Sequence, residues 1–147
     1  MVSDKLACGQ CCKLKALTAG LLIAYSLQQK MKDFRNVKVW EKSHQLTLVV
    51  YQITRSFPDD EKYGLVSQLR RSVSSIPANI AEGCGRGSDN DFARFIQVAI
   101  GSASETEYHF LLAKDLGFID AETWKDLNNK INEIKRMLIN LNKKLRS

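Results

Sequence analysis

Four consecutive segments of the sequence carry apolar residues at alternating steps of three and four positions. This spacing places the apolar side chains on one face of a helix, as in helices that pack against one another. Helix-stopping residues separate the segments: Pro58 follows the first, a glycine-rich stretch at 83–87 follows the second and Gly117 follows the third. The four apolar stripes are Val39, Ser43, Leu46, Val50, Ile53 and Phe57; Val66, Leu69, Val73, Ile76 and Ile80; Phe92, Ile96, Ala99, Ala103, Thr106, Phe110 and Ala113; and Trp124, Leu127, Ile131, Ile134, Leu138, Leu141 and Leu145.

These stripes predict an all-α fold, because no segment alternates with period two for long enough to indicate a strand. A repeat that averages about 3.5 residues predicts helices crossing at about 20°, and short connections favour antiparallel neighbours. We therefore expect residues 31–147 to form an up-down antiparallel four-helix bundle. Pro77 lies inside the second helix and should kink it, since proline cannot donate a backbone hydrogen bond. Alternatively, this bend shapes a polar site around Asn79 and Glu82.

Residues 1–30 do not continue the pattern. Their apolar run, from Ala16 to Leu27, is shorter than the roughly 20 residues that a membrane span needs, and no small-residue cleavage site follows it. Met31 has the position of a second start. We expect residues 1–30 to be a disordered extension or translated upstream sequence, the alternatives being an export or anchoring segment and an amphipathic helix.

The cysteines do not indicate a secreted disulfide framework. Cys8, Cys11 and Cys12 crowd into the first segment, so the bundle holds a single thiol, Cys84. The crowded cysteines also lack the second ligand pair and the nearby histidine of a zinc site. We expect a cytoplasmic protein without a bound metal, and the sequence leaves the role of these three cysteines open.

The sequence offers no constellation that favours an enzyme. Glu41 and His44 have the Glu-x-x-His spacing of di-iron bundles, but that chemistry needs two such motifs and two further glutamates. His109 follows Glu105 by four residues, and neither histidine falls on an apolar stripe, so both are expected at the solvated surface. No cysteine or serine has a partner base at recognisable spacing. We predict a non-enzymatic protein without a cofactor.

The basic charge is modest and uneven. The chain has 22 basic and 16 acidic residues, and residues 121–147 hold seven of the basic and three of the acidic ones. Lys and Arg neutralise phosphates, so a basic face could bind RNA or DNA; a solvated helix face is the alternative. Arg94 lies near the glycine-rich loop. The candidate phosphate-contacting residues are Arg70, Arg71, Arg86, Lys143 and Lys144.

Several apolar residues fall outside the inward stripes, on the first and third predicted helices. Several such residues on these two helices together indicate a subunit interface, so we predict a homo-oligomer. They are Leu48, Tyr51, Ile100, Tyr108, Leu111 and Leu112.

One run, Ser75-Ile-Pro-Ala-Asn-Ile-Ala-Glu-Gly83, is long enough to be specific. With the preceding Gln68-Leu-Arg-Arg71, it resembles the four-helix-bundle proteins encoded by intervening sequences within bacterial 23S ribosomal RNA genes. The resemblance covers Phe34 to about Leu145. It implies a homopentameric ring with basic surfaces, and the relation to accessory proteins of diversity-generating retroelements implies binding to a reverse transcriptase or its RNA. Besides the three arginines above, the polar residues that carry the pattern, without an established role, are Gln68, Asn79, Glu82, Glu105 and Glu107.

Two functional hypotheses follow from the residues and the resemblance. In the first, a non-enzymatic oligomer binds structured RNA through its basic residues. In the second, the protein is an interaction adaptor, such as an accessory protein of a reverse transcriptase. No membrane association is expected in either case.

Overall fold

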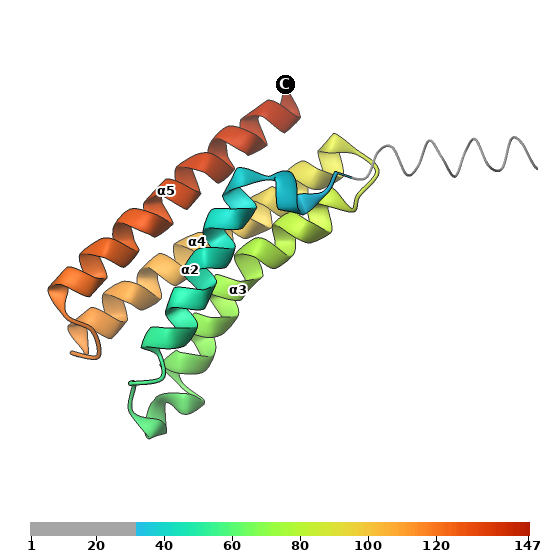
Figure 1. Ribbon diagram of the computed structural model, residues 1–147. Helices are drawn as coiled ribbons and strands as arrows, with labels where there is room; N and C mark the ends of the chain where they lie inside the picture. Colours follow the sequence, from blue (N-terminus) through green and yellow to red (C-terminus); the bar gives the residue numbers. More distant parts are fainter. Residues whose placement is uncertain (1–31) are drawn as a thin grey trace, which may run out of the picture. The chain divides into compact units, whose positions relative to one another are not determined.

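A computed structural model describes residues 32–147 of the protein, and these residues are helical, with no strand among them. The expectations about residues 1–30, the three crowded cysteines and the start at Met31 lie outside the described residues. The described elements, four of them long helices (Figure 1), are η1 (Phe34–Asn36), α2 (Lys38–Ile53), η2 (Asp59–Lys62), α3 (Leu65–Cys84), α4 (Asp89–Asp115) and α5 (Ala121–Arg146).

The helices form an up-down antiparallel bundle. Hydrogen bonds between side chains of α3 and α4 join Ser75 to Ser102 and Ser72 to Thr106, so the residue numbers rise on one helix as they fall on the other. Each helix packs against the next, and α2 also packs against α5, although less extensively than any consecutive pair packs. In the described bundle α2 and α4 are therefore diagonal, as are α3 and α5. This confirms the predicted fold.

The core is built from the predicted stripes. The large side chains with less than 2% of their surface exposed all fall on them: Val50, Leu69, Val73, Ile76, Ile80, Ile96, Phe110, Leu127, Ile131, Ile134 and Leu138, with Leu46 at 2%. The first helix ends earlier than its stripe does, at Ile53 rather than at Phe57. Thr54 closes the helix by donating its hydroxyl proton to the carbonyl of Val50 (2.8 Å). Phe57 is still buried, because the following turn packs its ring against Phe118 (5.3 Å between centroids).

Pro77 is buried in α3, and the helix is α-helical on both sides of it. The carbonyl that loses its partner is that of Val73, four residues earlier. The hydroxyl of Thr47 on α2 lies 3.3 Å from this oxygen and gives it a polar neighbour. The freed carbonyl therefore faces α2 and does not join Asn79 to Glu82 in one site. How far the helix axis bends at Pro77 stays a prediction.

Two glycines shape the ends of α3 and α4. A Cβ atom on Gly83 would lie 2.5 Å from Cδ2 of Phe92 and 3.0 Å from Cβ of Phe95, so the bare backbone lets α3 and α4 approach closely beside their connecting turn. Gly117 has a φ of 77°, and the amide of Phe118 donates to the carbonyl of Ala113, which is the glycine-terminated helix end that the sequence predicted. No helix in the described part of the chain is long and apolar enough to span a membrane.

Candidate nucleic-acid interface

One end of the bundle gathers basic side chains from α4, from α5 and from the turn that joins α3 to α4. Here α3 ends, α4 begins and α5 ends, and the side-chain amide of Asn142 donates to that of Gln97 (2.9 Å), which fixes α5 against α4. Because the two helices are antiparallel, one further turn along each reaches Arg94 on α4 and Arg146 on α5. We call this group the basic end; it consists of Arg86, Arg94, Lys143, Lys144 and Arg146.

Most of the charge of the basic end is not neutralised. Arg86 pairs with Glu82, four residues earlier on the same side of the turn. The other four members are exposed and form no ion pair within residues 32–147. The opposite end of the bundle has more carboxylates than basic groups, and its acidic residues are Asp59, Asp60, Glu61, Asp115, Asp120, Glu122 and Asp126. The charge is thus separated along the bundle axis.

An open hollow of about 360 Å³ lies within the basic end. The ring of Phe95 is half-buried, and the guanidinium carbon of Arg86 lies 4.7 Å from its centroid. The hollow is lined by Arg86, Asp91, Arg94, Phe95 and Val98. Phe95 and Val98 are not among the residues that the sequence predicted for a binding site. The signal that could have found them is a pair of apolar residues three positions apart, off the inward stripe and beside two arginines.

The structure places Arg70 and Arg71 away from the basic end. Arg71 lies thirteen helical residues, or about 20 Å, before the end of α3 at Cys84, and Arg86 follows in the turn after that end. Arg70 is half-buried; its Nε donates to the hydroxyl of Thr54 (2.8 Å), and its guanidinium lies 5.0 Å from the ring centroid of Tyr51. Arg70 therefore ties α3 to α2. The five candidate phosphate-contacting residues therefore do not form one surface. Arg86, Lys143 and Lys144 lie at the basic end, whereas Arg70 and Arg71 lie farther back along α3.

The polar residues that carry the family pattern bond mostly across or along helices and do not converge on one point. Arg71 donates to Gln68 (3.0 Å) and lies 3.7 Å from Glu105 on α4. Asn79 donates to the carbonyl of Ser75 (2.7 Å). Lys135 on α5 donates to Glu107 on α4 (2.6 Å), and this hydrogen bond lowers the pKa of the Glu107 carboxyl. These contacts give the residues structural roles.

His109 is buried, contrary to the expectation that both histidines lie at the surface. Only 8% of its surface is exposed, because it faces α3 across the α3–α4 contact. Its Nδ1 lies 3.4 Å from the hydroxyl of Ser72, which also accepts a hydrogen bond from Thr106 (3.1 Å). Burial lowers the pKa of His109, and the nearby Glu105 carboxylate opposes this only in part.

We expect acid to destabilise the bundle through His109. Its pKa in the folded protein is below the ordinary 6.5, so the unfolded chain takes up this proton first as the pH falls. The free energy of unfolding should therefore decrease when the pH is lowered from 7.5 to 5.5. Urea unfolding followed by circular dichroism measures this change, and it should be smaller in the His109→Gln variant. An equal decrease in both proteins would show that protonation of His109 does not cause the loss of stability.

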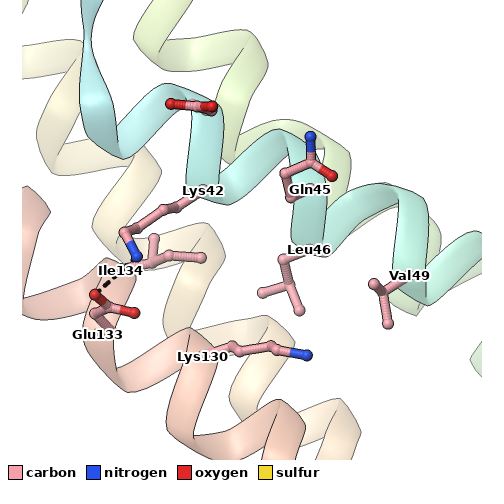
Figure 2. Close-up of a pocket in the computed structure, with 8 residues that line it drawn as sticks. Lys42, Gln45, Leu46, Val49, Lys130, Glu133 and Ile134 are labelled. Atoms are coloured by element: carbon pink, nitrogen blue, oxygen red, sulfur yellow. Dashed lines mark ion pairs between the residues drawn. The ribbon is translucent and has the colours of Figure 1, made fainter.

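A groove between α2 and α5 is a second concavity in the described bundle. It has a volume of about 550 Å³, and Leu46 and Ile134 contribute apolar side chains to its lining. Figure 2 shows how Lys42 of α2 reaches Glu133 of α5; their charged atoms are 2.9 Å apart. Glu41 also lines this groove.

The Glu-x-x-His pair does not form a metal site. Glu41 lines the groove, whereas the ring of His44 stacks on that of Trp40 with centroids 5.1 Å apart. Among residues 32–147 no three His, Cys, Asp or Glu side chains are grouped closely enough to hold a metal ion. Cys84 is buried, and burial raises the pKa of its thiol, which disfavours the nucleophilic thiolate.

Apolar side chains remain exposed on α2 and α4. Leu48 and Tyr51 are exposed on α2, and Tyr108 and Leu111 are exposed on α4, as the pattern predicted. Ile100 and Leu112 are half-buried instead, because each packs against the core. The two exposed groups lie on diagonal helices of the bundle, so they face different directions.

The fold and the charge distribution define a class of protein: antiparallel four-helix bundles with a basic end. The family model of the 23S rRNA-intervening sequence protein matches residues 35–140, and the chain belongs to that family. A crystal structure from Bacteroides thetaiotaomicron, described as a protein with unknown function from the S23 ribosomal protein family, is similar. It shares 30% sequence identity and a TM-score of 0.67, over 71% of this chain and 95% of that one. No curated protein matches the sequence.

Proposed function

We propose that this protein is a non-enzymatic, oligomeric RNA-binding protein of the cytoplasm that holds structured RNA at its basic end. The observation that carries the proposal is the exposed, unpaired charge of Arg94, Lys143, Lys144 and Arg146 on two adjoining helices. Basic side chains that replace the counterions of phosphates gain affinity by releasing them. Contacts of this kind position a protein on nucleic acid without reading its sequence.

Assembly would multiply this surface. The exposed apolar side chains of α2 and those of α4 lie on diagonal helices. The apolar face of α2 in one copy could therefore pack against the apolar face of α4 in the next copy. Contacts of this head-to-tail type close into a ring when the rotation between copies permits. The homopentamer that the family resemblance implies would carry five basic ends.

A salt series tests the proposal. Binding of a structured RNA hairpin, followed by fluorescence anisotropy, should weaken linearly in the logarithm of the salt concentration. The Lys143→Ala, Lys144→Ala, Arg146→Ala triple variant should lower the slope by about 2–3 and the affinity by about a hundredfold near 0.1 M salt, if each residue contacts one phosphate.

A matched control removes the same charge from the opposite end. The Arg55→Ala, Lys62→Ala, Lys125→Ala triple variant changes three exposed basic residues there and should bind almost as the unaltered protein does. An equal loss in the two triple variants would show that only net charge matters. Absence of binding even at low salt would overturn the proposal.

A protein-interaction adaptor is the second candidate function. Tyr108 and Leu111 are exposed on α4, and an exposed aromatic and leucine pair is typical of a protein interface. In this case a protein partner, such as a reverse transcriptase, would form a stable complex with the bundle. The Tyr108→Ala variant would then lose that complex, and free RNA would bind weakly at physiological salt.

A further inference from the structure

We propose that the hollow at the α3–α4 turn binds a single unpaired RNA nucleotide, with its base on Phe95 and its phosphate at Arg94. This inference rests on the proposed RNA-binding function and specifies what the basic end recognises in a structured RNA. The hollow, of about 360 Å³, is of a size that holds a small ligand. A base inside a regular helix could not enter it, whereas a bulged or looped-out base could.

Phe95 offers a rigid stacking surface. The backbone of Gly83 supports the start of its side chain, since a Cβ atom there would lie 3.0 Å from that of Phe95. The guanidinium of Arg86 lies 4.7 Å from the ring centroid, and Glu82 holds Arg86 in place. Aromatic rings and arginine planes are the groups on which proteins stack unpaired RNA bases.

Val98 extends the apolar side of the hollow. It lies three residues after Phe95 on α4, and 53% of its surface is exposed. Exposed Val98 and half-buried Phe95 together leave an apolar area that no other part of the described bundle covers. A flat, largely apolar base face is complementary to this area in shape and polarity.

The charges of the hollow suit a nucleotide better than a free anion. Arg94 is exposed and has no carboxylate partner among the described residues, so its guanidinium can donate hydrogen bonds to a phosphate. Asp91 also lines the hollow and would repel a phosphate close to it; its carboxylate accepts a hydrogen bond from the hydroxyl of Ser88 (2.7 Å). Asp91 still has acceptor capacity for an amino group of a base. Arg94 can therefore bind the phosphate of a nucleotide, while Asp91 accepts a hydrogen bond from an amino group of its base.

The position of the hollow fits binding of a helical stem nearby. Asn142 bonds to Gln97 on α4, one residue before Val98, so the end of α5 lies next to the hollow. Lys143, Lys144 and Arg146 could then contact the phosphates of a stem while a flanking unpaired nucleotide enters the hollow. The two contacts use different side chains, so they can be separated by substitution.

Two RNA hairpins whose loop is a flexible linker without bases test the inference: the stem of one is fully paired, and the same stem in the other carries a single bulged adenosine. The unaltered protein should bind the bulged RNA about tenfold more tightly at one salt concentration, because stacking on an aromatic side chain contributes about that much. The Phe95→Leu variant keeps an apolar side chain and the Cβ contact with Gly83, and it should bind both RNAs equally. Its affinity for the paired hairpin should not change.

A second variant keeps the test valid if Phe95→Leu perturbs the turn. Arg94→Ala changes an exposed residue, so the fold should be retained, and the preference for the bulged RNA should shrink. 2-Aminopurine at the bulge gives an independent signal: its fluorescence should change on binding to the unaltered protein and much less with Phe95→Leu.

The outcomes separate the two proposals. Equal binding of both hairpins by the unaltered protein, or equal weakening of both by Phe95→Leu, would overturn the nucleotide site and leave RNA binding by the basic end intact. Binding of neither hairpin at low salt would overturn both. The Lys143→Ala, Lys144→Ala, Arg146→Ala variant should weaken both hairpins and retain the preference.

Discussion

Replacing Phe110 with alanine should lower the free energy of unfolding by about 3–5 kcal/mol, which is the usual cost of removing a buried phenylalanine. Phe110 lies on α4, the helix that contacts both α3 and α5, and none of its surface is exposed. Removal of the ring would leave a cavity that the packed helices on its two sides cannot close. Domains of this size are stable by about 5–15 kcal/mol, so the loss is a large part of the total.

Urea unfolding followed by circular dichroism measures this loss, and the next residue provides the control. Leu111 is 41% exposed on the same helix, so Leu111→Ala should change the stability by no more than about 0.5 kcal/mol in the isolated bundle. If a second copy covers Leu111, its cost should rise with protein concentration while that of Phe110→Ala stays large. Equal costs at low concentration would contradict the position of Phe110 in the core.

The fold could be predicted from the sequence because the spacing of apolar residues within each helix identifies the face that is buried. Ile131, Ile134 and Leu138 repeat at helical spacing, and all three are buried against the neighbouring helices. The burial of His109 was not predicted because this residue lies beside the apolar stripe of its helix and not on it, and the Ser72 hydroxyl that lies beside its ring comes from α3. Burial of a polar side chain depends on a hydrogen-bonding partner, and this partner can lie on another helix, where the sequence of one helix does not reveal it.

The candidate site was predicted only in part, for a similar reason. The charge of residues 121–147 pointed to Lys143 and Lys144, and these residues do lie at the end of the bundle that holds Arg86. Charge alone also selected Arg70, whose guanidinium bonds to Thr54 and covers Tyr51. The hollow beside Phe95 could not be predicted, because it forms where two helices meet.

That meeting point depends on Gly83, and its replacement by valine should destabilise the protein by about 2–3 kcal/mol. Even the first added carbon would lie 2.5 Å from the ring of Phe92, which is buried and has no room to move away. The two methyl groups of valine would add to the overlap. The gain from replacing a helical glycine, at most about 1 kcal/mol, is too small to compensate.

Gly101 is the matched control, since it also lies within a helix, but a Cβ atom there meets nothing within 4 Å in the described part of the chain. Gly101→Val should therefore leave the stability unchanged or raise it by a few tenths of a kcal/mol. Chemical denaturation of the two variants should give effects of opposite sign or of clearly different size. Similar effects would mean that α3 and α4 do not approach closely at Gly83.

The Gly83→Val variant also links packing to recognition. The added side chain would push against Cβ of Phe95 as well as against Phe92, so it should displace the ring that stacks the unpaired base. Where the variant remains folded, it should lose the preference for the bulged hairpin and keep its affinity for the paired one, because Lys143, Lys144 and Arg146 lie on a different helix. A retained preference would mean that the nucleotide does not depend on the position of Phe95.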